Sequence, residues 1–234
     1  MKKYKILNLY ACLGGNRYKW DDVAKEAEIE IEVTAVELDE ELARLYQERF
    51  PNDKVIVSDA HQYLLDHYKE FDFIWTSPPC PTHSRFQISM KTKRKMKYPD
   101  MKLYQEIIFL DTFFEGKYVV ENVIPYYEVL IYAKKRGRHL YWTNFNLPNI
   151  LSNRKSPNMA AQELGRQKYK KLNTNVFDVF CEYHDYDFKK YKGNQDLGKI
   201  SRNLVDYEAG RTILKTALNI QKKENINQLD IFDL

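Results

Sequence analysis

Residues 3–15, KYKILNLYACLGG, decide the fold class of this 234-residue chain. Residues 3–11 read as a β-strand that runs into two adjacent glycines. A helical pattern follows over residues 20–28, and a second strand, IEVTAVELD, spans residues 31–39. Strands separated by helices of about 10–15 residues are typical of a parallel sheet with crossover helices, so the sequence predicts an α/β fold.

The alternation of strands and helices continues along the chain. Parallel sheets of this kind place ligands beyond the carboxyl ends of their strands. Residues 146–197 are polar, basic and weakly periodic, and we expect them to form a small inserted module. Further strands are predicted at residues 53–59, 71–79, 116–123 and 139–145, and further helices at residues 41–50, 63–71, 103–114, 127–135 and 208–221.

Composition narrows the class of protein. With 44% hydrophobic and 14% aromatic residues, the chain is typical of a globular protein rather than a disordered one. No apolar run approaches the roughly 20 residues that a membrane span needs, so no membrane partner is expected. Three scattered cysteines are too few for a disulfide framework and indicate a reducing cytoplasm. No metal site is expected, and the protein is expected to be a monomer.

Charge is unevenly distributed along the chain. The formal net charge is +4, from 37 Lys and Arg against 33 Asp and Glu. Residues 1–81 carry 10 basic and 16 acidic side chains, whereas residues 82–102 carry 7 basic and 1 acidic. The basic stretch is either a solvated loop or a loop that contacts nucleic-acid phosphates.

The ends of the first three predicted strands carry residues that suit a nucleotide. Gly14 and Gly15 allow a close approach of a ligand to the backbone, or they simply connect a strand to a helix. Glu37 suits ribose hydroxyls, although it is equally explained as a solvated carboxylate, and Asp59 suits an adenine amine. Their order at three successive strand ends favours a ligand that contains adenosine.

Three later segments carry reactive side chains. Cys80 lies between prolines at the end of an apolar strand, where a ligand is expected, although a buried cysteine is usually inert. Glu121 follows another apolar strand, so partial desolvation would let it hold a proton near neutral pH, unless it caps the chain locally. Arg136 and Arg138 suit phosphate or carbonyl binding, or form an exposed basic turn.

These motifs together resemble the DNA cytosine-5 methyltransferases, especially the compact phage or prophage type. The resemblance extends from Ile6 to about Leu218 and is interrupted by residues 146–197. It implies a Rossmann-like S-adenosylmethionine-dependent methyltransferase sheet with a small inserted target-recognition region. The motifs that carry it are NLYACLGGNRYKW for contact with S-adenosylmethionine, VTAVELD for ribose, SDA for adenine, PPCP for the nucleophile and ENV for proton handling.

The chain departs from the family pattern at three places. Cys12 stands where the first motif usually has a glycine, and Lys134 replaces the glutamine of the Gln-x-Arg-x-Arg motif. RNLV at residues 202–205 resembles the closing motif, which brings the C-terminal segment back to the cofactor pocket. Asp206 and Tyr207 occupy the positions where two prolines often follow.

The resemblance implies three sets of site residues. The catalytic residues are Cys80, Glu121, Arg138 and Arg136. The residues expected to bind S-adenosylmethionine are Tyr10, Cys12, Gly14, Gly15, Glu37, Leu38, Asp59, Ala60, Pro79, Asn203 and Val205. The residues expected to bind double-stranded DNA are Ser84, Arg85, Lys91, Lys93, Arg94, Lys95 and Lys97.

The resemblance also implies a reaction and a division of the chain. The Cys80 thiolate attacks carbon 6 of a flipped cytosine, Glu121 protonates or hydrogen-bonds ring nitrogen 3, and Arg138 holds the ring carbonyl, supported by Arg136. Residues 1–145 and 198–222 form the catalytic core. Residues 146–197 form the target-recognition region. Because this region is small, we expect a short recognition sequence or a strong dependence of recognition on the catalytic loop.

The tail, residues 223–234, is expected to be flexible and contains a second motif. The pentapeptide Gln228-Leu229-Asp230-Ile231-Phe232 resembles the motif that binds the bacterial sliding clamp. Two apolar anchors and an amide on a tether can dock into a preformed apolar pocket. The alternative is a tail whose hydrophobic residues are accidental.

Three other functions remain open. Ser77-Pro78-Pro79 resembles the motif of methyltransferases that act on an exocyclic amine of DNA, although Cys80 replaces the aromatic residue of that motif. The same cysteine chemistry would also methylate cytosine in tRNA. A non-catalytic DNA-binding protein or clamp adaptor is the third alternative, and the intact set of reactive residues disfavours it.

Overall fold

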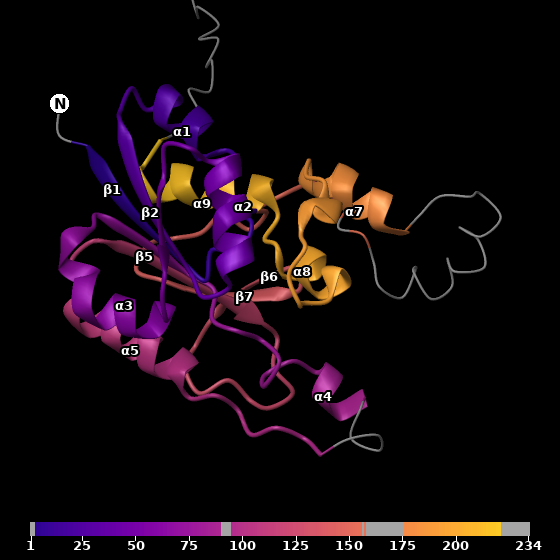
Figure 1. Ribbon diagram of the computed structural model, residues 1–234. Helices are drawn as coiled ribbons and strands as arrows, with labels where there is room; N and C mark the ends of the chain where they lie inside the picture. Colours follow the sequence, from indigo (N-terminus) through magenta and orange to yellow (C-terminus); the bar gives the residue numbers. More distant parts are fainter. Residues whose placement is uncertain (1–2, 90–94, 156, 158–175, 221–234) are drawn as a thin grey trace, which may run out of the picture.

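A seven-stranded sheet lies at the centre of the protein, with helices on both sides (Figure 1). The computed structural model describes residues 3–89, 95–155, 157 and 176–220. The strand order is β3-β2-β1-β4-β5-β7-β6. The strands are β1 (Tyr4–Leu9), β2 (Ile31–Glu37), β3 (Lys54–Val57), β4 (Phe73–Thr76), β5 (Lys117–Val123), β6 (Lys134–Arg136) and β7 (His139–Thr143).

Several of the helices start at an aspartate whose side chain caps them. Asp39, Asp59 and Asp206 each accept a hydrogen bond from a backbone N–H in the first turn of the helix that follows. The described helices are α1 (Trp20–Glu26), α2 (Glu40–Arg49), α3 (Ala60–His67), α4 (Phe86–Ser89), α5 (Lys102–Phe113), α7 (Val176–His184), α8 (Leu197–Asn203) and α9 (Tyr207–Ala217), with 3₁₀ turns η1 (Tyr68–Glu70) and η2 (Phe188–Lys190).

Alternate residues of the central strands face opposite sides of the sheet, as the pleat requires. On one face, Leu7 and Ile74 pack against the buried sides of α3 and α5. On the other face, Ile6 and Trp75 pack against α1 and α9. The central strands are therefore covered on both sides, which explains why they read as nearly continuous apolar runs.

The strand order reverses between β1 and β4. From β1 the chain moves outward to β2 and β3, and it then returns to pair β4 with the other side of β1. The loops that leave β1 and β4 consequently diverge and leave a crevice at the carboxyl ends of these strands, where ligands bind in open α/β sheets. The predicted α/β fold with a Rossmann-like sheet is confirmed.

The predicted helix over residues 127–135 is wrong. Residues 134–136 form strand β6, and the residues before it are not helical. Tyr127, Val129, Ile131 and Ala133 pack against the core, so the apolar positions repeat every second residue, as in extended chain. In the sequence alone, this run of apolar residues also fits a helical repeat.

The far edge of the sheet is antiparallel rather than parallel. β7 pairs antiparallel with β5, and β6 pairs antiparallel with β7. Gly137, with φ +57°, provides the left-handed residue of the tight turn between β6 and β7. This hairpin carries Arg136 and Arg138.

The described parts of residues 146–197 pack directly on the sheet and its helices. Leu147 and Leu151 join the core beside α9. Phe188 and Tyr191 pack beside α2, and the Tyr191 hydroxyl donates a hydrogen bond to Asp39 at 3.0 Å. In the described part of the chain, none of the helices is long and apolar enough to cross a membrane.

Candidate active site

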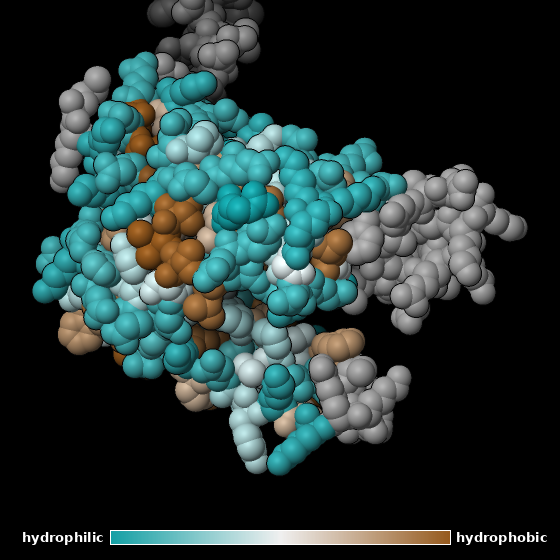
Figure 2. Space-filling model, viewed as in Figure 1, coloured by the Kyte–Doolittle hydropathy of each residue, from teal (hydrophilic) through white to brown (hydrophobic). Residues whose placement is uncertain are grey.

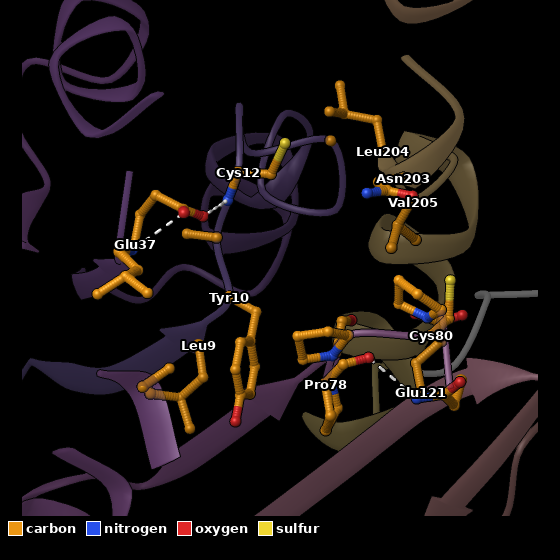
Figure 3. A pocket seen from close by; sticks show the side chains of 18 of the residues that line it. Leu9, Tyr10, Cys12, Glu37, Pro78, Cys80, Glu121, Asn203, Leu204 and Val205 are labelled. Carbon is orange, nitrogen blue, oxygen red and sulfur yellow. Dashed lines mark hydrogen bonds between the residues drawn. The ribbon is translucent and has the colours of Figure 1, made fainter. Parts of the chain in front are cut away.

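A cavity of about 650 Å³ lies at the carboxyl ends of the parallel strands. Residues at or just after the ends of β1, β2, β3, β4 and β5 line it, together with residues 199, 200 and 202–205. Figure 3 shows Glu37 and Cys12 on one side, with Tyr10 below them, and Cys80 and Glu121 on the other side. The crevice predicted from the strand order therefore gathers side chains from both halves of the sheet.

The loop after β1 has an unusual backbone. Tyr10 and Cys12 both have positive φ angles, +55° and +48°, in the left-handed region that favours glycine. The Cys12 backbone N–H donates to Glu37 Oε2 at 2.8 Å, which holds the loop against the end of β2. Cys12 thus adopts the backbone conformation that the glycine it replaces would favour. Tyr10 and Cys12 both line the cavity.

The two adjacent glycines have different surroundings. Gly14 is not among the residues that line the cavity, and a Cβ placed there would lie 2.4 Å from the Phe50 ring. Gly15 does line the cavity, and a Cβ there would lie 2.4 Å from the backbone oxygen of Val205. Close packing of the protein on itself thus explains why both positions need glycine.

Glu37 lies at the end of β2, and its carboxylate is held by the backbone. Oε1 accepts hydrogen bonds from the N–H groups of Leu38 and Asp39, at 2.9 and 3.0 Å. Burial raises the pKa of Glu37, while these backbone hydrogen bonds oppose the shift. A fixed carboxylate facing the cavity can accept hydrogen bonds from a ligand's hydroxyl groups.

Leu38, Asp59 and Ala60 also line the cavity, as the sequence predicts. Leu38 is 68% exposed, so it presents a large apolar side chain to the space beside Glu37. Figure 2 shows apolar residues, in brown, exposed within a largely hydrophilic face of the protein. A flat apolar ring would cover exposed apolar surface of this kind.

The segment around residues 203–205 closes the cavity from the other side. Asn203, Leu204 and Val205 line it, and Figure 3 shows them above Cys80. Leu204 also packs beside Leu13 and Leu42 in the core. The segment after α8 is thus anchored to the loop after β1, as the closing motif predicts.

Cys80 follows β4 and is half-buried. The Pro78 carbonyl, two residues before it, accepts a hydrogen bond from Asn122 Nδ2 at 2.9 Å, drawn as a dashed line in Figure 3. Burial raises the pKa of the Cys80 thiol, and the negative charge of Glu121 raises it further. The positive charge of Lys199 opposes the shift.

Glu121, near the end of β5, is buried and faces the same cavity. His139 lies on the neighbouring strand β7, and its Nε2 is 3.7 Å from Glu121 Oε1. His139 also lines the cavity. Sequence reasoning missed His139 because the contact depends on the antiparallel pairing of β5 with β7.

Two of the four predicted catalytic residues are not among the cavity-lining residues. The Arg136 guanidinium donates to the backbone carbonyls of Lys135, Leu147 and Pro148, at 2.6–2.9 Å. Arg138 lies in the exposed turn after Gly137. The Arg136 guanidinium is therefore bound to the backbone beside the hairpin, and neither arginine is among the residues that line the cavity.

The basic stretch after Cys80 is held at both of its described ends. Ser84 forms a β-bridge with Pro125, and Arg85 Nε donates to the Pro125 carbonyl at 3.4 Å. The Lys97 N–H donates to Gln87 Oε1, and its carbonyl accepts from the Tyr126 hydroxyl. Arg85, Lys95 and Lys97 are exposed.

Several predicted binding residues lie outside the described part of the chain. These are Lys91, Lys93 and Arg94 of the basic stretch, and Gln228, Leu229, Asp230, Ile231 and Phe232 of the tail. Among the described residues, no group of three or more His, Cys, Asp or Glu side chains is placed to hold a metal ion.

Sequence reasoning also missed a buried carboxylate beside the cavity. Glu106 lies on the buried side of α5 and contacts Tyr10, His61 and Thr76. A charged residue among the buried apolar positions 103, 107 and 110 of an amphipathic helix was the available signal. Its partners come from distant parts of the sequence, so no local pattern identifies them.

Comparisons with known proteins identify the family. Residues 4–124 match the family model described as C-5 cytosine-specific DNA methylase. No curated protein matches the chain. The matched range contains Tyr10, Glu37, Asp59, Cys80 and Glu121.

Solved methyltransferase structures show a more distant similarity. A Spodoptera frugiperda DNMT2 variant is 14% identical, with 93% of this chain and 100% of that chain covered and a TM-score of 0.48. The Entamoeba histolytica methyltransferase EhMeth is 10% identical, with 94% and 99% covered and a TM-score of 0.48. A methyltransferase solved with SAH, SMU.776, is 17% identical, with 50% and 30% covered and a TM-score of 0.33.

The family model covers more than half of the chain and includes the ends of all five parallel strands. S-adenosylmethionine is accordingly the methyl donor of the protein, and the chain belongs to the family of C-5 cytosine-specific DNA methylases.

Proposed function

We propose that the protein methylates carbon 5 of a cytosine in double-stranded DNA through a covalent bond to Cys80. The observation that carries the proposal is the single cavity shared by Glu37 and Asp59 on one side and by Cys80 and Glu121 on the other. A methyl group passes directly between donor and base only if both occupy one enclosed space.

The residues on the side of the cavity that contains Glu37 and Asp59 fit S-adenosylmethionine. Glu37 offers a fixed carboxylate to ribose hydroxyls, Leu38 offers an apolar surface to adenine, and Asp59 offers an acceptor to the adenine amine. Asn203 and Val205 line the same cavity and offer it a side-chain amide and an apolar surface. When bound, S-adenosylmethionine supplies an electrophilic methyl group.

Cys80 and Glu121 account for activation of the base. Carbon 5 of cytosine is a weak nucleophile until a thiolate adds to carbon 6 and leaves electron density on the ring. Glu121 takes up that charge by protonating or hydrogen-bonding ring nitrogen 3. After carbon 5 gains the methyl group, it loses its proton, the bond from Cys80 sulfur to carbon 6 breaks, and the 5,6 double bond returns.

The DNA is expected to approach along the basic stretch. Arg85, Lys95 and Lys97 are exposed on the segment that follows Cys80, where they can contact phosphates. Cys80 cannot reach carbon 6 within a stacked duplex, so the base must leave the helix. Residues 146–197 form the target-recognition region in this proposal.

Covalent trapping tests the proposal. We expect DNA carrying 5-fluorocytosine to form a stable adduct with the protein in the presence of S-adenosylmethionine, because fluorine at carbon 5 blocks the final proton loss. The adduct is detected by its reduced mobility in a denaturing gel.

The matched variants are Cys80→Ser and Cys181→Ser. The adduct should disappear in Cys80→Ser and persist in Cys181→Ser, since Cys181 is not among the residues that line the cavity. An adduct that survives Cys80→Ser would contradict the proposal.

Alkylation of Cys80 tests the electrostatics of the site. Because burial and the charge of Glu121 raise the pKa of Cys80 above its ordinary value of 9.0, the thiol stays protonated at pH 8. Iodoacetamide reacts with the thiolate, so Cys80 should react more slowly than free cysteine at this pH.

Glu121→Gln removes the negative charge and therefore lowers the Cys80 pKa, which should speed its alkylation about two- to fivefold. Peptide mass spectrometry of a time course measures the rate, and Cys181 in the same digest serves as the internal control. An unchanged Cys80 rate in Glu121→Gln would show that the two groups do not interact.

We also propose that the tail tethers the protein to the bacterial sliding clamp. The sequence Gln228-Leu229-Asp230-Ile231-Phe232 supplies an amide and apolar anchors for a preformed pocket. A tether of this kind would raise the local concentration of the enzyme at newly replicated DNA.

Binding of the full chain to purified clamp, measured by surface plasmon resonance, tests the tether. Phe232→Ala should weaken binding at least about tenfold, because it removes an apolar anchor. Ile226→Ala, an apolar change outside the pentapeptide, should leave it unchanged. Equal binding by wild type and Phe232→Ala, or no binding by the wild type, would refute the tether.

A further inference from the structure

Glu106 is a fully buried carboxylate that the proposed reaction does not use. Its exposed fraction is 0%, and it lies on α5 among apolar neighbours. An ionisable group in such a place is costly unless other groups satisfy it. The hydrogen bonds that satisfy it here therefore indicate what it does.

Three side chains hold the Glu106 carboxylate. The Tyr10 hydroxyl donates to Oε1 at 2.6 Å, and His61 Nδ1 lies 2.9 Å from the same oxygen. The Thr76 hydroxyl donates to Oε2 at 2.7 Å. Both oxygens are thus engaged by short hydrogen bonds in a buried site, where each bond is stronger than in water.

The three partners belong to three different segments of the active site. Tyr10 directly follows β1 and lines the cavity. His61 directly follows Asp59 and Ala60, which also line the cavity. Thr76 is the last residue of β4, four residues before Cys80. One carboxylate therefore joins the loop after β1, the start of α3 and the turn that carries the nucleophile.

The contact with Tyr10 fixes a strained residue. Tyr10 has φ +55°, a conformation that costs energy for any residue with a side chain. Burial raises the Tyr10 pKa, and Glu106 raises it further, so the hydroxyl remains a donor. The backbone strain and the hydrogen bond at the far end of the side chain together set the position of the ring.

The contact with His61 balances the buried charge. The hydrogen bond to Glu106 raises the pKa of His61, burial opposes the shift, and the charge of Glu106 adds to it. Lys102 lowers this pKa and Asp59 raises it, with smaller effects. His61 accordingly carries a proton over a wider pH range than a solvated histidine.

We propose that Glu106 is a positioning residue for S-adenosylmethionine: it holds Tyr10, the start of α3 and the Cys80 turn in the relative positions that the cofactor needs. The inference rests on the proposed placement of the cofactor in this cavity. Glu106 itself does not contact the cofactor in this proposal. Its effect passes through Tyr10 and through the backbone of Asp59 and Ala60.

Binding of S-adenosylhomocysteine, measured by isothermal titration calorimetry, tests the inference. In Glu106→Gln an amide nitrogen, which is a donor, replaces one oxygen that accepts hydrogen bonds. At least one of the hydrogen bonds to Tyr10, His61 and Thr76 is then lost, and affinity should fall about tenfold. Tyr10→Phe keeps the ring and removes its hydroxyl, and affinity should fall about three- to tenfold.

Two further measurements separate positioning from general stability. The double variant Tyr10→Phe/Glu106→Gln should lose less affinity than the product of the two single effects, because both changes act on one hydrogen-bond network. Glu115→Gln, an exposed residue just after α5, is the matched control and should bind as the wild type does. Steady-state kinetics should show a raised KM for S-adenosylmethionine with kcat reduced less than twofold.

The outcomes are distinct. If Glu106→Gln and Tyr10→Phe lower the melting temperature but bind S-adenosylhomocysteine within twofold of the wild type, Glu106 is merely structural and the inference is overturned. If Glu106→Gln does not fold, Tyr10→Phe and the control decide the same question. Absence of binding by the wild type would instead contradict the proposed cofactor site.

Discussion

The reversal of strand order between β1 and β4 is the constraint on which the rest of the site depends. β1 and β4 lie side by side and parallel, but the chain leaves them toward opposite edges of the sheet. The loops between them cannot fill the space at their carboxyl ends, which creates the crevice. Segments that would bind the methyl donor therefore lie beside segments that would activate the base.

Buried polar contacts keep these loops in place. Glu37 holds the loop after β1, Asn122 holds the Cys80 turn, and Glu106 joins both halves of the site. Each contact satisfies a polar group that would be costly to bury alone. The cavity is thus shaped by hydrogen bonds between segments that are far apart in sequence.

The positions of the cavity residues were largely predictable, because the carboxyl ends of parallel strands meet at one edge of a sheet. Glu37, Asp59, Cys80 and Glu121 were found in this way. Contacts that depend on tertiary pairing were not predictable. The hairpin at Gly137 places the Arg136 guanidinium on backbone carbonyls, and the residue pattern of the extended chain over residues 127–133 also fits a helix.

The identity of the methylated base tests the central claim most directly. Duplex DNA incubated with the protein and S-adenosylmethionine labelled in its methyl group should yield labelled 5-methyldeoxycytidine when its nucleosides are separated by mass spectrometry. That result requires the thiol and the methyl donor to act in one cavity. Label in N4-methyldeoxycytidine or N6-methyldeoxyadenosine, or label that enters tRNA but not DNA, would contradict the account.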